Sequence, residues 1–273
     1  MSTVAAKPAK VPPGFERREI KVNGVDVVLF LGGSGEPLVF LHGAGTVAGF
    51  NFSASWARKF KVYLPYHPGF GESPDSAAIT SIDDYVLHYL ELLDRLKLDK
   101  VRLVGLSLGG WIAATLATQN SHRLKKLVLV APAGLRVPEH PTTDIFRLKP
   151  DELPAYLVQD LRVLAPYVPD PHGPDFLDFL VNDYHEMSSF ARLAWERPYD
   201  PNLAKWLHRI SVPTLLLYGD KDRLTPAQQS KTWARLIPNA AVHIVKDAGH
   251  LVLDEKEEAP KAVLDFLSTH AQP

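Results

Sequence analysis

The segment that decides the fold is Val101-Arg102-Leu103-Val104-Gly105-Leu106-Ser107-Leu108-Gly109-Gly110. It combines an apolar strand pattern, a Gly-x-Ser-x-Gly turn and the start of an apolar helical pattern at 111–119. A strand-to-helix turn this sharp strains its central residue, and the residues two positions before and after it must be very small. Gly105 and Gly109 meet that requirement. The turn therefore predicts that Ser107 raises its Oγ above the end of a sheet, where the first helical amides favour developing negative charge.

Outward from this segment, apolar runs of strand length alternate with helical patterns, which is typical of a parallel sheet covered by helices on both faces. The N-terminal part differs, because Asn23-Gly24 separates two strand patterns as in a β-hairpin. We expect a mostly parallel, mixed sheet with an antiparallel N-terminal edge. The strands are expected at 19–22, 25–31, 37–41, 61–65, 101–106, 124–131, 214–219 and 241–245.

Helical patterns fill the gaps between these runs. The clearest covers 81–97, where Ser81 and Asp84 form a possible capping box. The alternation stops after Ala131, because nine prolines fall within 132–174, about four times the usual frequency. Leu157, Leu161 and Leu164 recur there at helical spacing, as do aromatic and apolar residues from 176 to 187. We therefore predict a cap of short helices at 133–209, inserted into a core formed by 14–132 and 210–273, and a disordered tail at 1–13.

The composition excludes several classes of protein. The 273 residues include 30 Lys and Arg against 31 Asp and Glu, so no basic excess suggests a nucleic-acid partner. The absence of cysteine removes disulfides, thiolate metal sites and a thiol nucleophile. No apolar run reaches the length of a membrane span, and the N-terminus lacks a signal-peptide pattern, so we expect a cytoplasmic protein with no membrane partner. The sequence does not indicate an oligomeric state.

A second glycine-rich turn follows the strand pattern at 37–41, with the sequence His42-Gly43-Ala44-Gly45. Its expected task is to present a backbone N–H. The amides of Ala44 and Leu108 would then form a two-donor oxyanion hole. His42 is interpreted as a structural residue that braces this loop.

At this point the chain resembles the α/β-hydrolase fold family, in the branch that has a serine nucleophile and a helical cap, and the resemblance extends from about 15 to 266. It implies that Ser107 is the nucleophile. The family's acid follows a later strand, where Asp222 fits best and Asp220 is the alternative. The family's base lies in a loop after the last strand, which matches His250. The order Ser107, Asp222, His250 is the order such hydrolases show.

The stretch from Tyr66 to Ser73 also resembles a family turn, except that Tyr66 replaces an acidic residue and so puts a structural hydrogen bond of the loop in doubt. Dehalogenase and epoxide hydrolase chemistry are disfavoured, because those members carry Asp where Ser107 stands. The remaining histidines, such as His140, His172 and His185, lack metal-site spacing, and no glycine motif completes a nucleotide loop. No cofactor and no metal are implied.

The expected function is hydrolysis of carboxylic esters through an acyl-enzyme intermediate. The alternatives are a carbon–carbon hydrolase of the ring-cleavage-product type, which tends to carry an aromatic residue where Leu251 follows His250, and a triad-retaining small-molecule receptor. Peracid formation stays open as a side activity. The substrate is expected to be a small molecule with an apolar or aromatic portion, because the predicted cap is rich in such residues: Tyr156, Leu157, Leu161, Leu164, Tyr167, Phe176, Phe179, Phe190 and Trp195.

Overall fold

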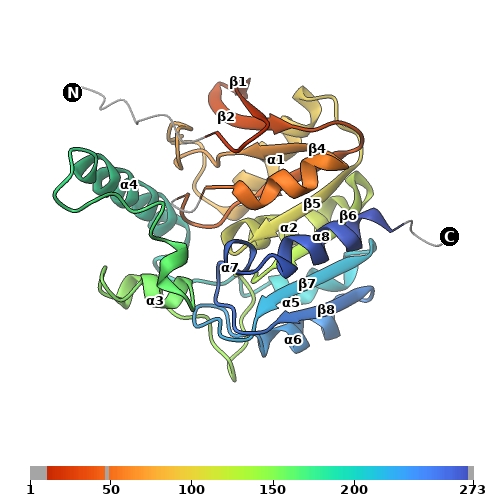
Figure 1. Ribbon diagram of the computed structural model, residues 1–273. Coiled ribbons are helices and arrows are strands. Elements are labelled where there is room, and N and C mark those ends of the chain that lie inside the picture. Colours follow the sequence, from red (N-terminus) through yellow and green to blue (C-terminus); the bar gives the residue numbers. More distant parts are fainter. Residues whose placement is uncertain (1–10, 47–48, 270–273) are drawn as a thin grey trace.

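An eight-stranded sheet forms the centre of the computed structural model, which describes residues 11–46 and 49–269 (Figure 1). The strand order is β1-β2-β4-β3-β5-β6-β7-β8. The predicted disordered tail at 1–13 lies outside the described residues except for its last three. The strands are β1 (Phe15–Val22), β2 (Val25–Gly32), β3 (Pro37–Leu41), β4 (Lys61–Pro65), β5 (Val101–Leu106), β6 (Leu124–Val130), β7 (Thr214–Gly219) and β8 (Ala240–Val245).

The strand pairing confirms the mixed sheet. β1 and β2 form the antiparallel hairpin around Asn23 and Gly24, whose positive φ angles of 46° and 84° suit a tight turn. β2 also pairs antiparallel with β4, and every pairing from β4 to β8 is parallel. The first strand begins four residues earlier than predicted, at Phe15. Residues 16–18 are exposed and charged on this edge strand, so no apolar alternation marked them.

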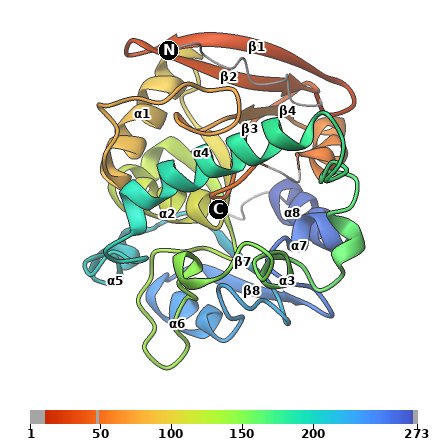
Figure 2. The same cartoon turned by 90° about the vertical axis from the view of Figure 1, so that its left-hand side faces the viewer.

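Helices cover both faces of the sheet, as predicted. Figure 2 shows α1 and α2 on one side of the strands and α8 on the other. The capping box also forms, since the Ser81 hydroxyl accepts a hydrogen bond from the Asp84 amide at 3.1 Å. The α-helices are α1 (Ile82–Arg95), α2 (Leu108–Asn120), α3 (Pro154–Leu157), α4 (Phe176–Ala194), α5 (Leu203–Trp206), α6 (Gln229–Leu236), α7 (Val252–Glu255) and α8 (Glu258–Ser268). Short 3₁₀ helices are η1 (Asn51–Arg58), η2 (Ser121–Arg123), η3 (Ile145–Arg147), η4 (Leu161–Val163) and η5 (Leu207–Arg209).

Residues 133–209, which we call the cap segment, contribute no strand to the sheet among the described residues. In Figure 1 α3 and α4 stand to the left of the sheet, and in Figure 2 α4 runs across the front of the central strands. The prediction of short helices alone was wrong for α4, which has 19 residues. The predicted apolar stripe was also wrong in part, because Tyr184 is 77% exposed. The division into a core and a cap domain stays a prediction.

The parallel strands place three loops at one edge of the sheet. β5 ends at Leu106, β7 at Gly219 and β8 at Val245, and neighbouring parallel strands present their carboxyl ends on the same side. In the described part of the chain, no helix is long and apolar enough to cross a membrane.

Candidate active site

Ser107 occupies the sharp turn between β5 and α2. Its φ of 53° and ψ of −112° lie in a backbone region that residues with a side chain rarely adopt. The flanking glycines explain how the chain accommodates the turn. A Cβ at Gly105 would lie 2.3 Å from the Gly109 carbonyl oxygen, and a Cβ at Gly109 would lie 2.1 Å from the Leu41 oxygen. The small residues that the sequence motif required are therefore imposed by close backbone contacts on both sides.

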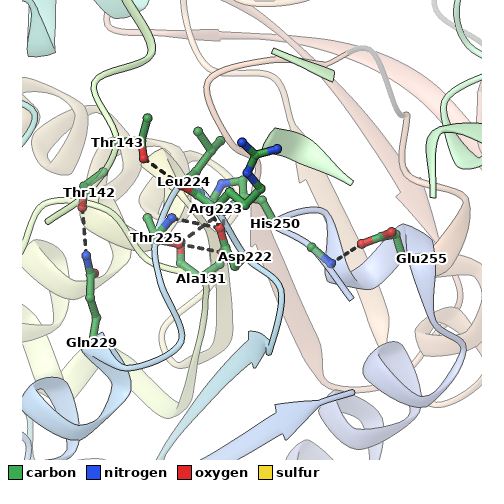
Figure 3. A network of polar contacts seen from close by, with 11 residues as sticks. Ala131, Thr142, Thr143, Asp222, Arg223, Leu224, Thr225, Gln229, His250 and Glu255 are labelled. Atoms are coloured by element: carbon green, nitrogen blue, oxygen red, sulfur yellow. Dashed lines mark hydrogen bonds and ion pairs between the residues drawn. The ribbon is translucent and has the colours of Figure 1, made fainter. Parts of the chain in front are cut away.

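Asp222 and His250 form a buried pair beyond the ends of β7 and β8. His250 Nδ1 lies 2.8 Å from Asp222 Oδ2, and the two side chains are 3% and 0% exposed (Figure 3). Because the carboxylate can only accept, Nδ1–H donates in this bond, which leaves Nε2 of a neutral ring free to accept a proton. The predicted acid and base are thus brought together across 28 positions of sequence.

The Asp222 carboxylate is held by three further donors. Oδ1 accepts from the amides of Leu224 and Thr225 at 2.8 and 2.9 Å, and Oδ2 accepts from the Thr225 hydroxyl at 2.9 Å. Charge-assisted bonds of this kind fix the carboxylate in one orientation. The alternative acid, Asp220, makes no contact with His250. Its Oδ2 lies 3.3 Å from Lys221 Nζ and its buried Oδ1 has no hydrogen-bond partner in the described residues.

Ser107 and Thr225, which holds Asp222, are both hydrogen-bonded to the turn that follows β6. The Ser107 amide donates to Val130 O at 2.9 Å, and the Ala133 amide donates to Ser107 O at 3.0 Å. Between these two residues, Ala131 O lies 3.2 Å from the hydroxyl of Thr225, which also contacts Asp222 (Figure 3). Ser107 Oγ itself makes no hydrogen bond to any described residue.

The predicted oxyanion donors, the amides of Ala44 and Leu108, lie next to the turn that carries Ser107. A Cβ at Gly43 would lie 3.4 Å from Ser107 Cβ, so the loop that carries Ala44 adjoins the serine. The first bond into α2 is the Trp111 amide to Ser107 O at 3.0 Å, which leaves the Leu108 amide without an intrahelical acceptor. Among the described residues, neither the Ala44 nor the Leu108 amide has a backbone acceptor outside regular helices and strands. Both N–H groups can therefore serve a substrate oxygen.

His42 braces the 42–46 loop, as predicted. Its Nδ1 donates to Gly43 O at 2.7 Å, and its Nε2 accepts from the His67 amide at 2.9 Å. The His67 ring donates back to His42 O at 2.8 Å and accepts from the Tyr89 hydroxyl. Burial lowers the pKa of His42 to about 3, so the ring stays neutral at ordinary pH and both of its bonds persist.

Three contributors were missed by the sequence analysis. Thr225 supplies the hydroxyl beside Asp222. Glu255 accepts from the amides of Gly249, Gln159 and Asp160, the last two at 2.6 and 2.9 Å, so it joins the loop before His250 to the cap segment. Glu186, on α4, is 1% exposed and bonds the loop that follows Ala44. Thr225 and Glu255 lie three and five positions after the predicted Asp222 and His250, Glu255 as the last residue of α7, whereas nothing near Glu186 in the sequence points to the site.

The predicted cap residues divide between interior and surface. Leu164 and Phe190 are buried, whereas Leu161 and Trp195 are 56% and 69% exposed. The Phe190 ring stacks on Phe146, with ring centres 5.4 Å apart. Within the described ranges, no group of three or more His, Cys, Asp or Glu side chains could hold a metal ion.

Comparisons with known proteins identify the family. The profile of the Alpha/beta hydrolase family matches residues 38–266. The 2-hydroxy-6-oxo-6-(2'-aminophenyl)hexa-2,4-dienoic acid hydrolase of Metapseudomonas resinovorans is 25% identical over 282 residues, which cover 96% of this chain and 94% of that protein. The poly(3-hydroxyalkanoate) depolymerase of Ectopseudomonas oleovorans is 32% identical over 197 residues, which cover 66% and 65%. Among solved structures, a bacterial membrane phospholipase A matches with a TM-score of 0.79 and 22% identity, over 93% of this chain and 86% of that one. Because the family profile spans most of the chain, this protein belongs to the alpha/beta hydrolase family and is a hydrolase.

Proposed function

We propose that this protein hydrolyses carboxylic esters through an acyl-enzyme formed on Ser107. The observation that carries the proposal is the buried Asp222–His250 pair, which leaves Nε2 of the ring free to accept a proton. Thr225, which holds this pair, and the strained turn of Ser107 are both hydrogen-bonded to residues 130–133. Two backbone amides would supply the oxyanion donors that acyl transfer needs, that of Ala44 in the loop after β3 and that of Leu108 at the start of α2.

In the first half of the reaction, His250 Nε2 removes the proton of Ser107 Oγ as Oγ bonds to the ester carbonyl carbon. The amides of Ala44 and Leu108 donate to the resulting oxyanion. When the carbonyl re-forms, the ester C–O bond breaks and the alcohol leaves with the proton that His250 carried. Asp222 keeps the ring oriented and stabilises it while it is charged.

In the second half, His250 removes a proton from water, whose oxygen attacks the acyl carbon. The bond to Ser107 Oγ breaks, Oγ recovers its proton from His250, and the carboxylic acid leaves. No redox step and no cofactor are needed for this sequence.

The charges around the cap segment favour a neutral ester over a dienoic acid. Every Arg and Lys between 133 and 209 is exposed, so none is buried to meet a substrate carboxylate. Burial raises the pKa of Asp183, which lies on α4. Burial also raises the pKa of Asp254, four positions after His250, to about 8. Neither carboxyl has a side-chain hydrogen-bond partner among the described residues. A raised pKa keeps a carboxyl uncharged over more of the pH range, so these two groups do not repel an anionic ligand, and the preference for a neutral ester rests on the exposed Arg and Lys residues.

The ring-cleavage-product hydrolase remains the second candidate, because several relatives, among them the Metapseudomonas resinovorans protein, are named as hydrolases of 2-hydroxy-6-oxo-dienoic acids. The depolymerase relative, whose named substrate is a polyester, favours the first. Leu251 also favours the ester, since carbon–carbon hydrolases of this fold tend to carry an aromatic residue after the base. A triad-retaining receptor is the third possibility, and it would turn over very slowly.

The test combines fluorophosphonate labelling with turnover of a p-nitrophenyl ester series of increasing chain length and of a 2-hydroxy-6-oxo-dienoate. We expect labelling of the wild type, its loss in Ser107→Ala, and faster turnover of at least one ester than of the dienoate. Labelling that survives in Ser107→Ala would refute the nucleophile. A dienoate that turns over faster than every ester would establish the second candidate, and labelling without any turnover would favour the receptor.

A further inference from the structure

A buried carboxylate connects the cap segment to the loop of the proposed oxyanion hole. Glu186 lies on α4 and is 1% exposed. Its Oε2 accepts from the Thr46 amide at 2.9 Å, and its Oε1 accepts from the Gly71 amide at 2.8 Å. The Thr46 hydroxyl also donates to Oε1 at 2.5 Å, and Asn182 Nδ2 donates to it at 3.2 Å. One side chain thus joins α4 to two loops of the core.

The contact falls two residues after the proposed oxyanion donor. Ala44 and Thr46 belong to the same loop, and a Cβ at Gly45, between them, would lie 3.8 Å from Glu186 Oε2. The carboxylate therefore fixes the outgoing end of this loop, while His42 fixes its incoming end through the Gly43 carbonyl. Ala44 is held between the two anchors.

Burying this charge is costly, since burial raises the pKa of Glu186 and only its hydrogen bonds oppose that shift. An apolar side chain could fill the same space without that cost but could not bind two backbone amides. The role of the carboxylate therefore lies in the loops that it orders.

We propose that Glu186 is a positioning residue, which sets the direction of the Ala44 N–H and makes the oxyanion hole depend on the position of α4. The inference rests on the proposed function of Ser107 and Ala44. When α4 lies against the core, the loop is ordered and the hole is complete. Any displacement of α4 removes both amide contacts and leaves the loop without its second anchor.

Glu186→Gln tests this role with little change of shape. Each carboxylate oxygen accepts from a backbone amide, so the glutamine NH₂ faces a backbone N–H in either orientation, and one of the two contacts is lost. Asp75→Asn is the matched control. Asp75 pairs with Arg192, which lies on α4 as Glu186 does, through two contacts of 2.5 Å each. In the described structure Asp75 touches no residue of the 42–46 loop.

The measurements are kcat and KM on the best p-nitrophenyl ester, and the dissociation constant of an alkyl trifluoromethyl ketone, which adds Ser107 Oγ to form a tetrahedral adduct. For Glu186→Gln we expect kcat to fall by about 10- to 100-fold and the ketone to bind weaker by a similar factor, with KM changed less than about threefold. Asp75→Asn should stay within about twofold in all three. If Glu186→Gln does not fold, Thr46→Val, which removes only the hydroxyl contact, should show the same pattern at about two- to tenfold.

Equal behaviour of Glu186→Gln and Asp75→Asn would overturn the inference, as would a loss confined to KM. Failure of the proposed function gives a different result: Ser107→Ala would keep its ester turnover, or the wild type itself would turn over no ester faster than the dienoate, whatever Glu186→Gln does.

Discussion

Replacement of Asp222 with asparagine should move the ring proton of His250 from Nδ1 to Nε2 without disturbing the loop that carries residue 222. Oδ1 of Asp222 accepts from two backbone amides, at 2.8 and 2.9 Å, so the asparagine oxygen must take that position. Its NH₂ group then faces His250 Nδ1, which can only accept from it. The ring proton moves to Nε2, and the nitrogen that should receive the Ser107 proton no longer can.

The loss of the correct tautomer in a triad of this type lowers kcat by about 10⁴-fold, which corresponds to about 5.5 kcal/mol of transition-state stabilisation. The assay is steady-state ester hydrolysis at pH 7 to 8, with the melting temperature as a check that the loop is intact. Asp220→Asn is the control, because Asp220 lies in the same loop and does not contact His250. An Asp222→Asn enzyme within tenfold of wild type would refute the tautomer argument, and an equal loss in Asp220→Asn would reassign the acid.

Two further predictions concern the framework of the site. Gly105→Ala would place a Cβ 2.3 Å from the Gly109 carbonyl oxygen. We therefore expect the melting temperature to fall by several degrees and fluorophosphonate labelling to be lost. Full labelling at an unchanged melting temperature would contradict the close contact. Burial lowers the pKa of His42 to about 3, of His88 to about 4, and of His67 well below its usual value, so each takes up a proton on unfolding once the pH drops below about 6.5. These three groups should make the free energy of unfolding fall as the pH is lowered from 6.5 towards 4, by up to about 4 kcal/mol per pH unit, and a urea-unfolding free energy that stays constant from pH 7 to 5 would show that they do not.

The elements predicted best from the sequence are those whose conformation depends on neighbouring residues. The hairpin follows from Asn23-Gly24, and the turn at Ser107 follows from two glycines at fixed spacing. The expected helix at 111–119 extends from Leu108 to Asn120 because its first turn begins directly at the serine. Each of these features is decided within about ten residues of sequence.

The features that the sequence did not reveal depend on distant partners. Glu186 is 140 positions away from Thr46, and nothing near it in the sequence distinguishes it from an exposed helical glutamate. The apolar stripe expected along α4 failed at Tyr184 because this helix contacts the core on a face that includes polar residues such as Glu186 and Ser189. A pattern of hydrophobicity cannot identify a buried face that is held by hydrogen bonds.

The left-handed backbone at Ser107 limits which nucleophiles an engineer could install on this scaffold. At a φ of 53°, a β-branched side chain meets its own backbone, so threonine is a poor exchange although it carries the same hydroxyl group. Cysteine and alanine, which are unbranched at Cβ, fit the same conformation. Conversion to a thiol enzyme is therefore open to this scaffold, whereas conversion to a threonine hydrolase would first require the bend itself to be rebuilt.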